Sequence, residues 1–160
     1  MTSVDTETVK AAVRETYGRI ASEPRPSGCC GTSGCCGPAD QPGSSALGYS
    51  ENERQSAPEG SDLGLGCGNP QAIAELQPGE RVLDLGSGAG FDAFLAARQV
   101  GPSGSVIGVD MTPEMITKAR GNISKTDLRN VEFRLGEIEH LPVADESIDV
   151  IMSNCVINLS

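Results

Sequence analysis

The sequence has no tryptophan and a single histidine, and aromatic residues make up only 3% of its 160 positions. It also lacks any apolar run of about 18 residues, the length expected of a membrane-spanning helix. With so few aromatic side chains, a buried core has to consist mainly of Val, Leu, Ile, Ala and Met. That composition is typical of parallel α/β layers, and the length is that of one domain.

Basic residues are scarce as well. There are 12 Lys and Arg against 22 Asp and Glu, which gives a formal net charge of −10. Such a charge repels nucleic acids and anionic membrane surfaces, so we expect neither as a partner. The N-terminus is polar and has no apolar export signal, which predicts a cytoplasmic protein. Its six cysteines are then expected to stay reduced rather than to form disulfides.

A glycine-rich segment at 82–90, Val-Leu-Asp-Leu-Gly-Ser-Gly-Ala-Gly, indicates a turn that follows a buried strand. A second apolar run then ends at Asp110. In a Rossmann-type unit the glycines let the backbone approach a nucleotide, and the acid accepts hydrogen bonds from the ribose. Because Phe91 stands where a dinucleotide fingerprint has its third glycine, the turn suits S-adenosylmethionine better than a pyrophosphate. The alternative is a tight strand-to-helix turn without a ligand.

Apolar periodicity and turn residues predict alternating strands and helices. The expected strands are 81–85, 105–109, 131–135 and 148–152, and the expected helices are 6–21, one from Asn69-Pro70, 91–100 and one from Thr112. This alternation predicts a Rossmann-like α/β sheet in which the strand order begins 3-2-1-4.

Two regions of different composition divide the chain. Residues 1–48 hold an amphipathic helix, with Val9, Val13, Tyr17 and Ile20 on one stripe, and a loop rich in Gly, Pro, Ser and Cys. Residues 49–160 are expected to form the cofactor-binding domain. The sequence ends just after the fourth expected strand, and we expect a fragment whose sheet is incomplete.

The cysteines fall into three groups. Cys155 follows the fourth strand, which places it at the rim of the expected crevice, and Cys67 lies in a glycine-rich turn that could fold over that crevice. Several thiolates at one point select a thiophilic ion. The third group lies in the polar loop: Cys29, Cys30, Cys35 and Cys36.

Other interpretations of the cysteines stay open. Cys67 and Cys155 could each be buried core residues, since cysteine is often buried. The four loop cysteines could hold structural zinc, although adjacent cysteines suit the usual zinc knuckle poorly. The single histidine, His140, precedes a Leu-Pro turn and is expected to be a loop residue rather than a catalytic base.

Four segments carry a family resemblance: Leu-Gly-Leu-Gly-Cys-Gly-Asn-Pro at 63–70, the turn at 82–90, Gly-Val-Asp-Met-Thr-Pro-Glu-Met at 108–115, and Ser-Asn-Cys-Val-Ile-Asn-Leu-Ser at 153–160. Together they resemble the bacterial S-adenosylmethionine-dependent arsenite methyltransferases. The two middle segments are typical of class I methyltransferases in general. The first and last, each with one cysteine, are specific to the arsenical branch. The resemblance implies an incomplete class I methyltransferase sheet, because family members continue beyond this point and carry a further arsenic-binding cysteine.

The resemblance also implies roles for individual residues. Cys67 and Cys155 would bind arsenic, assisted by one or more of the four loop cysteines. Met111 would lie against the adenine of S-adenosylmethionine, with Glu137 and Ile138 along its edge. The residues expected to hold the rest of the cofactor are Asp84, Gly86, Ser87, Gly88, Gly90 and Asp110.

The expected reaction transfers a methyl group to trivalent arsenic, with arsenite arriving as a thiol conjugate. Arsenic held by thiolates keeps a lone pair that can attack the methyl group, so no general base is required. Glutathione or thioredoxin would restore the thiols. Two other functions remain open: a methyltransferase for a small organic acceptor, and a non-enzymatic module that binds arsenite or a soft metal.

Overall fold

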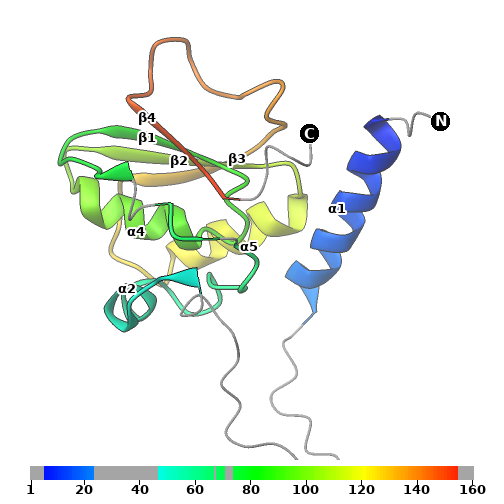
Figure 1. Cartoon of the computed structure of the whole chain (residues 1–160), viewed down its shortest axis with the longest axis horizontal. Coiled ribbons are helices and arrows are strands. Elements are labelled where there is room, and N and C mark those ends of the chain that lie inside the picture. Colours follow the sequence, from blue (N-terminus) through cyan, green and yellow to red (C-terminus); the bar gives the residue numbers. More distant parts are fainter. Residues whose placement is uncertain (1–5, 24–46, 67, 71–73, 155–160) are drawn as a thin grey trace, which may run out of the picture.

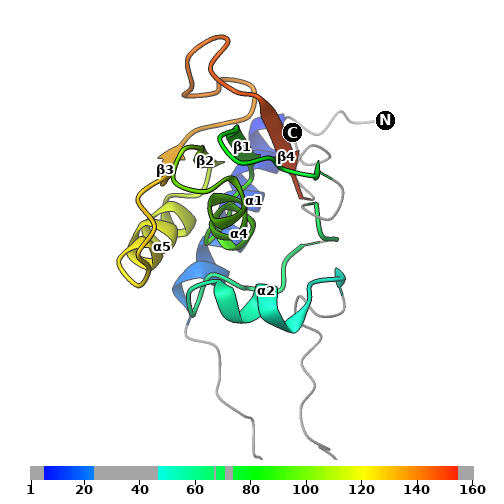
Figure 2. The ribbon, with the colours of Figure 1, turned by 90° about the vertical axis from the view of Figure 1, so that its left-hand side faces the viewer.

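The computed structural model describes residues 6–23, 47–66, 68–70 and 74–154. Its centre is a parallel sheet of four strands in the order β3-β2-β1-β4. The strands are β1 (Arg81–Leu85), β2 (Ser105–Asp110), β3 (Val131–Leu135) and β4 (Val150–Ser153). Figure 2 shows the four strands side by side in this order. The expected Rossmann-like topology is therefore confirmed.

Helices α4 (Phe91–Val100) and α5 (Pro113–Ile123) pack below the sheet in the view of Figure 1. The core between these helices and the sheet is mostly aliphatic, as the composition predicts. Two of its aromatic residues, Phe94 and Phe133, meet edge to face with ring centroids 5.4 Å apart. The other helices are α1 (Thr6–Ser22), which packs against α5, and the short α2 (Glu51–Ser56).

The opposite face of the sheet is covered by the long connection between β3 and β4, which arches above the sheet in Figure 1. A second apolar cluster forms here, in which Leu83, Leu85 and Val109 are buried. Ile148 packs against this cluster, and β4 begins two residues later than expected, at Val150. The chain turns into the sheet at Asp149, whose N–H donates to the Arg81 carbonyl at 2.8 Å.

One expectation about the helices needs correction, and another falls on residues that the structure does not describe. In α1, Val9 is 38% exposed and Lys10 is buried instead, because Lys10 forms ion pairs with Glu137 and Glu139 in the segment after β3. The helix expected from Asn69-Pro70 falls mostly on residues 71–73, which the structure does not describe. Within the described residues, no helix is both long and apolar enough to cross a membrane.

Candidate functional site

A cavity in the described part of the chain lies at the carboxyl ends of the strands. The strand order reverses at β1: the chain runs from β1 outward to β2 and β3, and then returns to place β4 on the other side of β1. Such a switch point is where open α/β sheets bind ligands. The loops after β1, β2 and β3 line the cavity, and α1 and residues 61–66 enclose it.

The turn after β1 forms the floor of the cavity. The N–H groups of Gly86 and Ser87 both donate to the Val109 carbonyl, at 2.8 and 3.0 Å, which ties the turn to β2. Gly86 and Gly88 have φ values of 71° and 52°, in the left-handed region that favours glycine. Gly90 also has a positive φ, but a Cβ there would come within 2.5 Å of Phe133. Gly90 therefore serves packing, and it is not among the cavity-lining residues.

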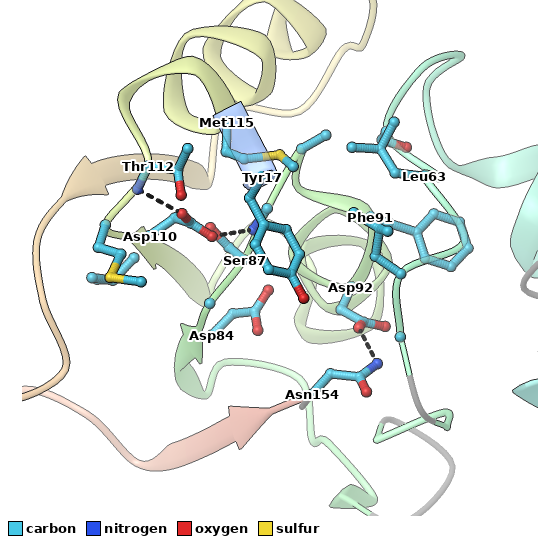
Figure 3. Close-up of a pocket in the computed structure, with 18 of the residues that line it drawn as sticks. Tyr17, Leu63, Asp84, Ser87, Phe91, Asp92, Asp110, Thr112, Met115 and Asn154 are labelled. Carbon is cyan, nitrogen blue, oxygen red and sulfur yellow. Dashed lines mark hydrogen bonds between the residues drawn. The ribbon is translucent and has the colours of Figure 1, made fainter. Parts of the chain in front are cut away.

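Asp110 closes one side of the turn. Its carboxylate accepts hydrogen bonds from the N–H of Gly88 at 2.9 Å and of Thr112 at 2.8 Å (Figure 3). Burial raises the pKa of this carboxyl, and the two backbone hydrogen bonds oppose that rise. The acid, Met111 and Thr112 all line the cavity. A carboxylate fixed in this way presents its remaining lone pairs at the end of β2.

Asp84, at the end of β1, is only 2% exposed, and its Oδ2 has no hydrogen-bond partner among the described residues. The same holds for the Ser87 hydroxyl oxygen. The pKa of Asp84 is raised by burial first, and then by the nearby charges of Asp92 and Asp110. Buried polar atoms in native proteins normally have partners, so two unpartnered oxygens on one cavity wall indicate that a polar ligand completes the site.

Helix α1 supplies the wall opposite the sheet. Tyr17 points into the site (Figure 3), and Lys10 and Val13 also line it. The Lys10 ammonium lies 2.8 Å from a carboxylate oxygen of both Glu137 and Glu139. These ion pairs fasten the helix to the segment after β3.

The structure separates the two residues expected along the adenine edge. Ile138 lines the cavity, as does its neighbour Glu139. Glu137 instead pairs with Lys10 and Arg14 of α1 and is not among the lining residues. The hydrogen bond from Lys10 holds the pKa of the Glu137 carboxyl below its usual value. Of the residues expected at the cofactor, Asp84, Gly86, Ser87, Gly88, Asp110, Met111 and Ile138 come together at the cavity.

A polar network that the sequence did not reveal lies at the β4 side of the cavity. The Tyr49 hydroxyl donates to Asp92 at 2.6 Å, and the Asn154 amide donates to the other oxygen of Asp92 at 3.2 Å (Figure 3). Asn154 was visible only as part of the Ser-Asn-Cys turn after the fourth strand. No local sequence pattern marked Tyr49 or Asp92 as candidate site residues.

The six cysteines lie outside the described residues, so their expected roles stay predictions. They are Cys29, Cys30, Cys35, Cys36, Cys67 and Cys155. The residues that are described contain no group of three or more His, Cys, Asp or Glu that could hold a metal ion.

Comparison with known proteins shows which family has a similar sequence. The methyltransferase domain family matches residues 76–160. The arsenite methyltransferase of Halobacterium salinarum is 58% identical over 98% of this chain and 42% of its own length. That of Aquipseudomonas alcaligenes is 48% identical over 64% of this chain and 31% of its own. The chain thus spans less than half the length of these curated relatives.

A solved structure is also similar to this chain. The arsenic(III) S-adenosylmethionine methyltransferase of Chlamydomonas reinhardtii matches 72% of this chain and 39% of its own, with a TM-score of 0.53 and 39% identity. The chain therefore belongs to the methyltransferase domain family, has the Rossmann-like sheet of class I methyltransferases, and is a homologue of the arsenite methyltransferases.

Proposed function

We propose that this chain binds S-adenosylmethionine in the cavity at the carboxyl edge of the sheet and transfers its methyl group to trivalent arsenic held by thiolates. One observation carries the proposal: a buried carboxylate, Asp84, and a half-buried one, Asp110, flank a glycine turn at the switch point of the sheet. When bound, S-adenosylmethionine supplies a methyl group on a positively charged sulfur, together with a cationic ammonium and a ribose. Acidic acceptors suit each of these groups.

Different residues around the cavity would hold different parts of the cofactor. Asp110, already fixed by Gly88 and Thr112, would accept hydrogen bonds from the ribose hydroxyls. The oxygen of Asp84 that has no partner among the described residues would accept a hydrogen bond from the ammonium group, whose opposite charge would favour the ionised form of this acid. The apolar side chain of Ile138 and the thioether of Met111, both of which line the cavity, would hold the adenine.

The cysteines supply the acceptor site. The relatives named arsenite methyltransferases support Cys67 and Cys155 as arsenic ligands, with help from the four loop cysteines. Arsenite exchanges its As–O bonds for As–S bonds and releases water. The arsenic lone pair then forms the As–C bond, while the electrons of the broken C–S bond stay on the cofactor sulfur. No proton leaves the nucleophile, which fits a site where His140 is exposed and does not line the cavity.

The methylated arsenic is formally pentavalent. Two thiols return it to the trivalent state by forming a disulfide, and glutathione or thioredoxin reduces that disulfide. This requirement places the reaction in a reducing compartment, the cytoplasm. The net charge of −10 argues against a nucleic acid as the acceptor.

The test is a methylation assay on the full chain. The protein is incubated with S-adenosylmethionine, sodium arsenite and glutathione, and methylated arsenic is measured by liquid chromatography with arsenic detection. We expect product from the wild type. We expect none from Cys155→Ser, whose affinity for S-adenosylhomocysteine stays unchanged. Methyl transfer to a quinol or an amine but not to arsenite would contradict the proposal, and so would stoichiometric arsenite binding without product.

A further inference from the structure

Two of the aspartates that line the cavity receive hydrogen bonds from nearby donors (Figure 3). Asp110 accepts from two backbone N–H groups, at 2.9 and 2.8 Å. Asp92, in the first turn of α4, accepts from the Tyr49 hydroxyl at 2.6 Å and from the Asn154 amide at 3.2 Å. Burial raises the pKa of Tyr49 well above its usual value, so this hydroxyl remains a donor throughout the physiological range. Hydrogen bonds to the charged form of a carboxyl group favour that form.

Asp84, at the end of β1, borders the same cavity under different conditions. It is only 2% exposed, and its Oδ2 has no hydrogen-bond partner among the described residues. Burial raises its pKa, and the charges of Asp92 and Asp110 raise it further. A buried carboxylate without a partner is costly, and such a group takes up a proton instead. Of these three acids, Asp84 is therefore the one that the structure favours as the site of a proton.

The described residues offer little positive charge to this group of acids. Among those that line the cavity, Lys10 of α1 is the only cationic side chain, and its ammonium lies 2.8 Å from a carboxylate oxygen of both Glu137 and Glu139. Lys10 is not among the charges that shift the pKa of Asp84. The phenol of Tyr17, which points into the site from the same helix, carries no positive charge (Figure 3). A compensating charge has to come from solvent, as a proton, or from a ligand.

We propose that Asp84 carries a proton in the ligand-free cavity and releases it to solvent when the ammonium group of S-adenosylmethionine binds beside it. The ammonium keeps its own protons, and no bond of the cofactor breaks in this step. The inference rests on the proposed function and adds to it that cofactor binding is coupled to proton release. Binding should therefore tighten as pH rises, by up to about tenfold per pH unit for one proton, until the pH exceeds the pKa of the ligand-free acid.

The experiment is isothermal titration calorimetry of the full chain with S-adenosylhomocysteine, which carries the same amino-acid group as the cofactor. Titrations are run between about pH 5 and 7.5, each in two buffers of different ionisation enthalpy, because the difference in heat counts the protons released. We expect the wild type to release up to one proton. The release should pass through a maximum between the pKa of Asp84 in the complex and its pKa in the ligand-free protein.

Methylthioadenosine is the matched control ligand. It has the adenosine and the sulfur of the cofactor but lacks the amino-acid group, so it brings no ammonium to Asp84. Its binding should release no proton and should depend little on pH.

Two variants test the role of Asp84. Asp84→Asn should abolish the proton release and leave the Kd for S-adenosylhomocysteine nearly independent of pH. Asp92→Asn removes a negative charge beside Asp84, so the maximum of release should move to lower pH. The matched control is Asp62→Asn, which also removes an acid from the cavity wall, although Asp62 is not among the charges that raise the pKa of Asp84. This control should leave the maximum where it is.

Three results would overturn the inference while the cavity remains the cofactor site. They are binding to the wild type without proton release across this pH range, a release that persists in Asp84→Asn, and an equal release with methylthioadenosine. If the wild type does not bind S-adenosylhomocysteine at all, the proposed function fails, and the inference fails with it. Should Asp84→Asn fail to bind, Asp92→Asn decides, because an unmoved maximum would contradict the role of Asp84.

Discussion

At the scale of single residues, the site contains a carboxylate that works against stability. Asp84 is buried, its Oδ2 has no hydrogen-bond partner in the part of the chain that the structure describes, and burial raises its pKa well above the usual value. Between the unfolded and the native pKa, the native state therefore binds more protons than the unfolded state. The free energy of unfolding then falls as pH rises through the native pKa. Such a cost is typical of a residue kept for a ligand.

We accordingly expect Asp84→Asn to raise the free energy of unfolding of the ligand-free protein at pH 7 by about 1 kcal/mol or more, since a neutral amide costs less to bury than a charge. Thermal unfolding measures this. The gain should shrink as pH is lowered, because the wild-type acid becomes protonated there. The stabilisation that S-adenosylhomocysteine gives the wild type should be reduced in the variant.

Asp149→Asn is a matched control for which we expect the opposite change in stability. Hydrogen bonds from Arg81 lower the pKa of Asp149 to about 2, so this acid contributes stability above its unfolded pKa and loses it as pH falls. Its replacement should lower Tm at pH 7, by a small amount because the pair is exposed. An Asp84→Asn protein that is less stable than the wild type at pH 7 would show that Asp84 is a structural acid.

The second residue prediction concerns Asp110. Asp110→Ala should raise the Kd of S-adenosylhomocysteine about ten- to a hundredfold, because hydrogen bonds to a charged acceptor contribute roughly 1.5–3 kcal/mol. The variant also frees the Gly88 and Thr112 N–H groups that hold the turn. Isothermal titration calorimetry measures the affinity, with the exposed Asp127→Ala as control. Unchanged affinity would refute the ribose assignment.

At the scale of elements, α1 forms a wall of the cavity that we propose as the cofactor site, although the helix lies outside residues 76–160, which match the methyltransferase domain family. Its attachment is electrostatic where it meets the segment after β3, through Lys10, Glu137 and Glu139. At its other end, the Ala21 carbonyl accepts a hydrogen bond from Lys118 of α5 at 3.1 Å. The helix is thus held at both ends across the cavity.

Lys10→Glu should loosen this attachment, because it places a third carboxylate beside those of Glu137 and Glu139. We expect a several-fold rise in the Kd of S-adenosylhomocysteine and faster amide hydrogen exchange in α1. The double variant Lys10→Glu with Glu139→Lys restores one opposite-charge pair and should recover part of the affinity. The control is Arg19→Glu, the same reversal at an exposed position of the same helix. Equal effects of both reversals would mean that net charge, and not the ion pair, sets the affinity.

The elements themselves were largely predictable from the sequence. The strands and α4 follow from local apolar runs bounded by turn residues, and the left-handed turn after β1 follows from its alternating glycines. What the sequence could not reveal depends on contacts between distant positions. Tyr49 lies 43 residues from Asp92, and Asn154 lies 62 residues from it, so no local pattern marks their network.

The same reason explains the placement of Glu137. After β3, the Gly136 N–H donates to the Asp110 carbonyl, and Glu137 forms an antiparallel bridge with His140. This local turn decides that Ile138 and Glu139 line the cavity while Glu137 faces α1. Apolar periodicity ends with the strand at Leu135, so the sequence pattern did not show which of the two acids would line the cavity.

At the scale of the whole molecule, the sheet gathers the loops after β1, β2 and β3, together with Asn154 after β4, at one edge, and α1 encloses them from outside. The opposite edge, where the strands begin, carries different contacts, such as the Arg81–Asp149 pair. A ligand at the cavity should therefore affect one end of the molecule and leave the other unchanged. That asymmetry makes the location of the site directly measurable.

The most direct test is a titration of the isotope-labelled protein with S-adenosylhomocysteine, followed by two-dimensional amide NMR. We expect large shifts for the amides of Gly86, Gly88, Thr112 and Ile138, and for Tyr17 of α1. The amides of Arg81 and Asn130, at the far edge, should not move. Shifts confined to the far edge, or no shifts at saturating ligand, would contradict the assignment of this cavity as the cofactor site.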